Sequence, residues 1–169
     1  SHDHLTHLKN RRVAEHQIDQ MIHTATRIQQ SMALMVLDLD GFKSVNDSEG
    51  HDAGDQVLIE VANRLNNLTR KSDIVARWGG DEFVIALNDT TQETATLLAQ
   101  RFLQTISQPI DIGKDKIAIV GASIGIVICP ENAASFNTAF ECADIAMYQV
   151  KQAGKRNVRV YNPQATALL

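Results

Sequence analysis

The chain has 169 residues, 44% hydrophobic and 21% charged, which is typical of a single compact domain. We therefore expect one domain over residues 1–169. Its formal net charge of −4 argues against a nucleic-acid partner, because binding to nucleic-acid backbones needs a basic surface. The two cysteines, the polar N-terminus and the short apolar runs favour a cytoplasmic protein, or a cytoplasmic domain of a membrane-anchored one.

Hydrophobic spacing predicts the first elements of secondary structure. Helical periodicity begins at Ala14 and continues to Ile28. The apolar run Ala33–Leu37 predicts a buried strand that ends at Asp38. The polar segment 40–55 is expected to be a loop, and a helix with apolar positions from Val57 to Leu68 follows it.

The second half of the chain opens with a predicted β-hairpin. Strands over Ile74–Trp78 and Phe83–Leu87 flank the turn at Gly79 and Gly80. A helix follows, with apolar positions from Ala95 to Ile106 and with Thr90 or Thr91 as its cap. The last elements are a β-rich segment over Lys116–Ile128, a helix from about Asn137 to Gln152 and a strand over Val158–Tyr161.

This order of elements predicts an α+β fold. A hairpin turn of two glycines is too short for a parallel crossover, so at least one strand pair is antiparallel. Helices between the other strands would pack against the sheet. We expect a central, mostly antiparallel sheet with flanking helices.

Acidic residues stand where the predicted strands end. Asp38 closes the buried strand, and Asp81 and Glu82 follow the double-glycine turn. If the hairpin lies beside the first strand, Asp38 and Asp81 converge, and clustered carboxylates form an oxygen-rich site suited to Mg²⁺. Glycines at 79 and 80 would let a substrate approach the backbone. The alternative is a plain hairpin with solvated acids.

Four segments of the chain resemble the motifs of one known family. The segment 77–83, which reads RWGGDEF, resembles the signature of GGDEF domains, which are diguanylate cyclases. The segment 38–55, DLDGFKSVNDSEGHDAGD, resembles the second long motif of that family. Residues 1–12 and 148–157 resemble its N-terminal and C-terminal motifs, although His7 stands where the family usually has glycine. The resemblance implies a ferredoxin-like fold, as in the palm of polymerases and nucleotide cyclases.

The resemblance also implies roles for the acidic residues. Asp38, Asp81 and the main-chain carbonyl of Leu39 would hold two Mg²⁺ or Mn²⁺ ions per active site, with Glu82 as an additional ligand. Asp81 and Glu82 are the expected catalytic residues, and Asp81 would help to deprotonate the attacking ribose hydroxyl.

Substrate-binding residues follow from the same resemblance. Asn46 and Asp55 would recognise guanine, because a carboxylate accepts hydrogen bonds from its N–H groups. His51 stands at a substrate-contacting position or holds the loop. The remaining expected GTP contacts are the backbone around Phe42 and Lys43, the glycines Gly79 and Gly80, and the side chains of Lys151 and Lys155, with Arg156 as an alternative to Lys155.

A second ligand site is expected at Arg70 and Asp73, joined by Arg101. In the family, such an Arg-x-x-Asp motif resembles an inhibitory site for the product, cyclic di-GMP. An arginine fork can bind phosphate or guanine, and an aspartate can accept from guanine N–H groups. The alternative is an ordinary surface ion pair.

The function that the resemblance implies is the condensation of two GTP molecules into cyclic di-GMP, in bacterial signalling. Each domain would hold one GTP, so catalysis would need a homodimer. The alternative is a non-catalytic module that binds GTP or cyclic di-GMP. Attached sensor or EAL domains are expected in a longer protein, since residues 162–169 resemble the connector into an EAL domain. A polymerase palm is disfavoured because there is no basic groove for nucleic acid.

Overall fold

The computed structural model describes residues 1–164, and its element order places a six-stranded sheet at the centre of the molecule. The last five residues of the expected connector lie outside this range. The elements in chain order are β1 (Lys9–Asn10), α1 (Arg11–Ile28), β2 (Met32–Asp40), α2 (Phe42–Glu49), α3 (His51–Leu68), β3 (Ile74–Gly79), β4 (Glu82–Leu87), α4 (Gln92–Ile106), β5 (Ile110–Gly113), β6 (Lys116–Ala118), β7 (Gly121–Cys129), α5 (Phe136–Gln152) and β8 (Asn157–Val160).

The sheet has the strand order β1-β3-β4-β2-β7-β8. β2 runs antiparallel to β4 and to β7, β3 runs antiparallel to β4, and the edge strands β1 and β8 pair in parallel. The unit β2-α3-β3-β4-α4-β7 is therefore a ferredoxin-like βαββαβ core, as expected. β1, α1, α5 and β8 extend this core, and a small hairpin of β5 and β6 is inserted before β7.

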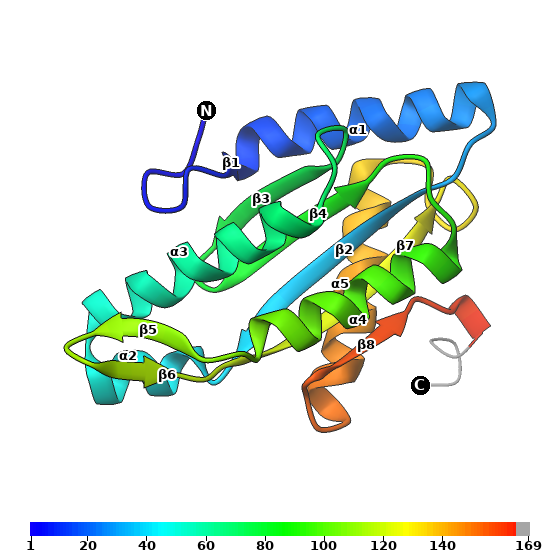
Figure 1. Ribbon diagram of the computed structural model, residues 1–169. Helices are drawn as coiled ribbons and strands as arrows, with labels where there is room; N and C mark the ends of the chain where they lie inside the picture. Colours follow the sequence, from blue (N-terminus) through cyan, green and yellow to red (C-terminus); the bar gives the residue numbers. More distant parts are fainter. Residues whose placement is uncertain (165–169) are drawn as a thin grey trace.

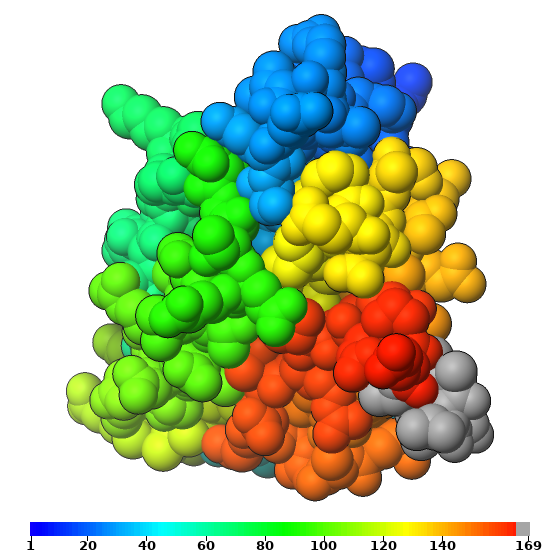
Figure 2. All heavy atoms as spheres, turned by 90° about the vertical axis from the view of Figure 1, so that its right-hand side faces the viewer, coloured from blue at the N-terminus to red at the C-terminus, as the bar shows by residue number. Residues whose placement is uncertain are grey.

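Helices cover both faces of the sheet, α3 and α4 on one side and α1 and α5 on the other (Figure 1). Two clusters of buried side chains correspond to the two faces. Phe83 and Phe102 belong to the cluster under α3 and α4, whereas Ile18 and Ile22 belong to the cluster under α1 and α5. Figure 2 shows the end of the molecule where the end of α1 and the segment after β7 lie together.

The predicted elements are confirmed where periodicity was strong, and side-chain caps set the starts of the helices. Asn10 caps α1 by accepting from the Val13 amide, Thr91 caps α4, and Ser135 caps α5. The predicted turn at the two glycines is also present. Within residues 1–164, no helix has the length and apolar character that crossing a bilayer requires.

One expectation about the elements was wrong, and the sequence left two features of the strands unresolved. Segment 40–55 is not a loop, because α2 and the start of α3 occupy it and are separated only by Gly50. α2 buries only Val45, so it has no apolar stripe for periodicity to detect. The β-rich segment after Lys116 is two strands, since the chain leaves β6 at Ala118 and enters the central sheet at Gly121. The short strands β1 and β5 were not expected.

α5 packs unusually close to β7, and Gly125 permits this approach. A Cβ at Gly125 would lie 2.0 Å from the Ala143 carbonyl oxygen and 2.3 Å from the Met147 amide nitrogen. Both atoms are backbone, so they cannot rotate out of the way. The absence of a side chain at this one position therefore fixes how α5, and every residue it carries, sits on the sheet.

We predict that Gly125→Ala lowers the free energy of unfolding by about 3 kcal/mol or more, because α5 must move away from β7. Urea unfolding followed by circular dichroism measures the change. Gly79→Ala is the matched control: it adds the same methyl group to a strand end with no atom within 4 Å of it. Equal stability of the two variants would contradict the close-packing argument.

Candidate active site

Carboxylates gather where β2 leaves the sheet beside the β3–β4 turn. Asp38 on β2 lies directly opposite Glu82 on β4. The amide of Leu39 donates to the Asp81 carbonyl oxygen over 3.1 Å, which ties the turn to β2. The side chains of Asp38 and Asp81 are close enough to share a hydrogen bond. The expected convergence of these acids is therefore present in the fold.

The pKa values of two of these groups reflect the crowding. Burial, followed by the hydrogen bond and the charge of Asp38, raises the pKa of Asp81 to about 6. Burial and the charges of Asp144, Asp38 and Asp81 raise the pKa of Glu82 to about 7, while Arg11 acts in the opposite direction. The site therefore carries more negative charge than the protein itself neutralises, and a cation would relieve the repulsion.

Asp144 belongs to this cluster, although sequence analysis did not identify it. It lies on α5, and its pKa is raised by burial and by the charge of Asp38. Asp144 precedes Lys151 by seven residues, so both lie on the same side of the helix. That spacing is the signal that could have indicated Asp144 once Lys151 was considered a site residue.

Lys151 is the cation closest to the carboxylates. Its ammonium group lies 3.1 Å from an Asp38 oxygen and 2.7 Å from an Asp40 oxygen. Burial lowers its pKa, but the hydrogen bonds to Asp40 and Asp38 outweigh burial and raise the pKa overall. Lys151 is therefore charged and held within the acidic cluster, rather than free on a solvated helix end.

The N-terminal segment holds the glycine turn in place through Arg77. Arg77 donates to the Gly80 carbonyl oxygen over 2.9 and 3.1 Å, and it pairs with Asp3 over 3.3 Å. Asp3 also accepts from the amide and hydroxyl of Thr6. His7 has a φ of +62°, the left-handed conformation that favours glycine, so the turn has the form expected for its position.

The expected guanine-binding residues lie where α2 meets α3. Gly54 makes their close approach possible, because a Cβ at Gly54 would lie 1.8 Å from the Asn46 side-chain oxygen. Asn46 is half-buried against α3, and Asp55 on α3 is exposed. The structure thus places Asn46 and the residue next to Asp55 in contact.

The expected phosphate-binding segment forms the start of α2. Gly41 precedes the helix with a φ of +85°, and no side chain caps the helix. The first amides of α2, at Phe42 and Lys43, therefore have no intrahelical acceptor and can donate to an anion. Phe42 is partly buried and Lys43 is exposed.

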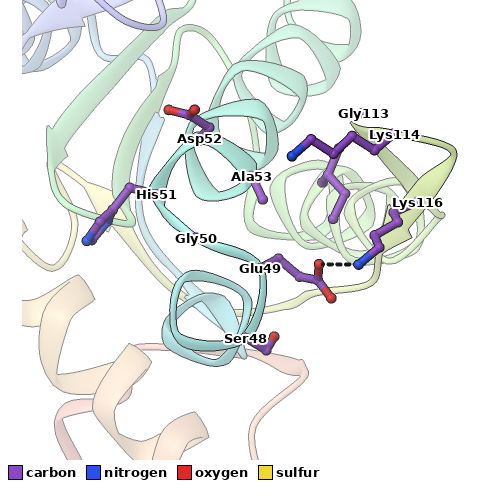
Figure 3. Close-up of a pocket in the computed structure, with 10 residues that line it drawn as sticks. Ser48, Glu49, Gly50, His51, Asp52, Ala53, Gly113, Lys114 and Lys116 are labelled. Carbon is purple, nitrogen blue, oxygen red and sulfur yellow. Dashed lines mark hydrogen bonds and ion pairs between the residues drawn. The ribbon is translucent and has the colours of Figure 1, made fainter.

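His51 lies beside a cavity of about 510 Å³ between the α2–α3 turn and the β5–β6 hairpin. Lys114 and Lys116 come from the hairpin, and Lys116 pairs with Glu49 over 3.2 Å (Figure 3). The His51 side chain points away from both lysines. None of the clustered carboxylates lines this cavity, so it is separate from the site at the end of β2.

The two basic residues after α5 differ in orientation. The Arg156 side chain packs over β7, because a Cβ at Gly121 would lie 2.7 Å from its Cγ atom. Arg156 also lines a cavity with Gly121 and Ala122, away from the carboxylates. Both residues are exposed, and they differ in that the Arg156 side chain packs along β7.

The expected second-site residues line one cavity of about 490 Å³. Arg70 and Asp73 come from the turn before β3, and Arg101 comes from α4. The Asp73 side chain is 2% exposed and accepts from the amides of Arg70 and Asn88, so it shapes the turn. The Arg70 side chain is 56% exposed, and it pairs with Asp73 and the Asn88 carbonyl. The ion-pair alternative and a ligand cavity are therefore both compatible with this geometry.

The donor set at the end of β2 fits a divalent metal ion only with help from a substrate. Among residues 1–164, no three acidic, histidine or cysteine side chains form a complete metal site by themselves. Two adjacent carboxylates, Asp38 and Asp81, leave coordination positions for water and phosphate oxygens. Mg²⁺ is usually held in this way in nucleotide-dependent enzymes, so the residues present fit it.

In the absence of metal, we expect the free energy of unfolding to fall as pH rises. We predict that this fall is smaller in Glu82→Gln than in the unmutated protein. The pKa of Glu82 is about 7 in the fold against an ordinary value of 4.5. Between these values the unfolded chain has lost a proton that the folded chain keeps, so the free energy of unfolding falls as pH rises. For this partly exposed group the fall is on the order of 1–2 kcal/mol.

Urea unfolding in EDTA between pH 4.5 and 7 measures this fall. Glutamine does not titrate, so the variant should lose less stability than the unmutated protein over this range. Glu141→Gln, which neutralises an exposed carboxylate on α5, should leave the pH dependence unchanged. Identical pH profiles for Glu82→Gln and the unmutated protein would contradict the assignment.

The chain is similar to proteins of one family along almost its whole length. A family model described as "Diguanylate cyclase, GGDEF domain" matches residues 1–157. The chain is 41% identical over 167 residues to the probable diguanylate cyclase DgcE of Escherichia coli K12, which covers 99% of the chain and 15% of DgcE. It is 34% identical over 163 residues to the cyclic di-GMP phosphodiesterase NbdA of Pseudomonas aeruginosa, which covers 96% of the chain and 21% of NbdA.

Solved structures agree with this result. The GGDEF domain of TpbB from Pseudomonas aeruginosa superposes with a TM-score of 0.96 at 32% identity, covering 99% of the chain and 98% of that domain. The GGDEF domain of DgcB from Caulobacter crescentus, solved in complex with cyclic di-GMP, superposes with a TM-score of 0.89 at 26% identity, covering 95% of each chain. The chain spans less than a quarter of the length of DgcE and NbdA. By sequence and by fold, the chain belongs to the family of diguanylate cyclase GGDEF domains.

Proposed function

We propose that this domain is a catalytically active diguanylate cyclase, which joins two GTP molecules into cyclic di-GMP and releases two pyrophosphates. Family membership alone does not decide this, since similar proteins are named both as cyclases and as phosphodiesterases. The observation that carries the proposal is the set of adjacent carboxylates, Asp38, Asp81 and Glu82, beside an intact Gly79-Gly80 turn. A module that only binds nucleotide would not need to bring these like charges together.

Asp38 and Asp81, with the Leu39 carbonyl, would hold two Mg²⁺ or Mn²⁺ ions. Bound there, such ions would stabilise the attacking and leaving oxygens in nucleotidyl transfer. Asp81 would also take the proton from the ribose 3′-hydroxyl. Its pKa of about 6 leaves the carboxylate mostly ionised at neutral pH while keeping it more basic than an ordinary aspartate. Glu82, opposite Asp38, adds a further negative charge beside the same site.

The remaining residues would bind and orient GTP. Asn46 and Asp55 would read guanine where α2 meets α3, because adenine lacks the N–H groups that a carboxylate needs. The free amides at the start of α2 would hold the terminal phosphates, with charge neutralisation by Lys151 and Lys155. Gly79 and Gly80 leave room beside the turn, since no atom lies within 4 Å of a Cβ built at either position.

Each domain would hold one GTP, so the reaction needs two domains facing each other. A bound GTP cannot present a second 3′-hydroxyl to its own α-phosphate. A two-fold arrangement supplies both attacks at once, because each domain meets the other through the same surface. In the full-length protein, attached domains would control how often two such domains meet.

We further propose that the cavity of Arg70, Asp73 and Arg101 binds the product. Two arginines from different elements face a space of about 490 Å³ that Leu97 and Leu98 also line. Guanidinium groups suit the phosphates and guanine edges of cyclic di-GMP, and the leucines suit the flat faces of its bases. Cyclic di-GMP bound in this cavity, away from the carboxylates, would inhibit the domain that made it and so act as feedback.

We expect Asp81→Asn to reduce cyclic di-GMP formation by at least about a hundredfold while the protein stays folded. Asparagine is a poor Mg²⁺ ligand and cannot accept the proton. Purified protein is incubated with GTP and Mg²⁺, and the product is separated by chromatography. Asp115→Asn, in the exposed β5–β6 hairpin, is the control and should retain activity. If the unmutated domain binds GTP but forms no product, the domain is a binding module instead.

We expect Arg70→Ala to raise the inhibition constant of cyclic di-GMP about 10- to 100-fold, because a charged hydrogen-bonding group is lost from the cavity. The initial rate at low product should stay the same, since Arg70 lies away from the carboxylates. Initial rates at increasing added product measure both quantities. Lys71→Ala removes a neighbouring exposed cation that does not line the cavity, and it should not change inhibition. Unchanged inhibition in Arg70→Ala would rule out this cavity as the inhibitory site.

A further inference from the structure

Asp40 is a buried carboxylate at the end of β2, two residues after Asp38. It is 3% exposed and accepts hydrogen bonds from three groups. Its Oδ1 atom accepts from Lys151 over 2.7 Å and from the Ser123 hydroxyl over 2.9 Å. Its Oδ2 atom accepts from the backbone amide of Arg156 over 2.9 Å and again from Ser123 over 3.1 Å. Both oxygens are therefore directed at protein groups, which leaves neither facing a nucleotide.

The turn after α5 has an unusual backbone. Gly154, Lys155 and Arg156 all have positive φ angles, +120°, +67° and +53°. Two successive non-glycine residues in the left-handed region cost free energy, so other contacts must hold them there. The Lys155 amide donates to the Val150 carbonyl over 2.9 Å, which closes the helix end, and the Arg156 amide donates to Asp40. Asp40 is the side chain that fixes the second left-handed residue.

Arg156 is held on its other side as well. Its side chain lies against Gly121, the residue opposite Asp40 on β7. Arg156 is thus held at its amide by Asp40 and at its side chain by β7, and the preceding Lys155 is exposed. One buried carboxylate therefore contacts Lys151 directly and positions Lys155 through the neighbouring amide.

Asp40 also prevents Lys151 from pairing with Asp38 alone. The ammonium lies between the two carboxylates and is closer to Asp40, at 2.7 Å, than to Asp38, at 3.1 Å. Without Asp40, the strongest acceptor left to Lys151 would be Asp38, and a tighter pair would withdraw both groups from a substrate. Lys151 therefore contacts two carboxylates at once, the buried Asp40 and Asp38 of the candidate active site.

We propose that Asp40 is the positioning residue for the GTP phosphates: it holds Lys151 and the turn that carries Lys155 in fixed places without contacting the nucleotide. The inference rests on the proposed function, because it assigns the two lysines to the triphosphate. It predicts that loss of Asp40 weakens binding of a triphosphate while binding of a monophosphate changes little. Guanine recognition would be unaffected, because it depends on α2 and α3.

Asp40→Asn tests the inference with little change in size. The amide group of asparagine would face Lys151 or the Arg156 amide with a donor, so at least one of the two contacts is lost. Calorimetry with 3′-deoxy-GTP, which lacks the attacking hydroxyl, and with GMP measures binding without turnover. We expect the dissociation constant for 3′-deoxy-GTP to rise about tenfold or more and that for GMP to change less than about twofold. Equal losses for both nucleotides would overturn the inference.

A second variant and a control separate positioning from stability. Gly121→Ala leaves Asp40 intact but displaces Arg156, and it should lower triphosphate affinity in the same selective way. Ile18→Val, in the core under α1, lowers stability at a distance and should not change the ratio of the two dissociation constants. A changed ratio in Ile18→Val, or an unchanged ratio in Gly121→Ala, would contradict the inference.

A double-mutant cycle tests whether Asp40 acts through the turn. Lys155→Ala should weaken 3′-deoxy-GTP binding in the unmutated background and have a smaller effect in Asp40→Asn, because the turn is already displaced. Fully additive effects would overturn the inference. If the unmutated domain does not bind 3′-deoxy-GTP, the proposed function fails and the inference fails with it. Binding with an unchanged preference in Asp40→Asn overturns the inference alone.

Discussion

Repulsion among neighbouring carboxylates is the constraint on which the site depends. Asp38, Asp81, Glu82 and Asp144 come from three elements, and the pKa values of the last three are raised by burial and by their neighbours. Like charges in a half-buried site separate unless the backbone forbids it. Here the antiparallel pairing of β2 with β4 forbids it, since Asp38 and Glu82 are fixed opposite each other. The sheet therefore supplies the free energy that keeps these acids together.

The surrounding structure can be understood as support for that arrangement. The hydrogen bonds from Arg77 hold the glycine turn, and the close contact at Gly125 holds α5 with Asp144 and Lys151. Each support acts on the backbone rather than on the reacting groups. This arrangement leaves the carboxylates themselves free to change partners, as the proposed binding of a nucleotide and its cations would require.

Much of the fold could be predicted from the sequence because its helices and strands are strongly patterned. The apolar stripes of α1, α4 and α5 have a clear helical period, the apolar run of β2 is continuous, and the two glycines mark the hairpin. α2 could not be predicted, because it is short and buries a single apolar residue, Val45. β1 consists of two residues, too few to give a period at all.

The residues of the candidate site could likewise be predicted only in part from the sequence. Asp38, Asp81 and Glu82 were identified because they stand next to predicted strand ends, where polar residues are conspicuous. Asp144 and Asp40 were not, because one lies inside a helix and the other inside a motif whose first aspartate explained it. Their importance depends on which groups the fold brings within hydrogen-bonding distance, and periodicity contains no information about such distances across the sheet.

The two edge strands of the sheet, β1 and β8, also affect how the domain behaves at high concentration. An exposed strand edge has unpaired amides and carbonyls, and two such edges can join and begin aggregation. In this domain β1 has two residues and β8 has four, and Arg159 is exposed on β8. Short edges with a charged side chain are poor templates for a foreign strand. The domain can therefore be crowded against copies of itself with little risk of fibre formation, which the proposed two-domain reaction would require.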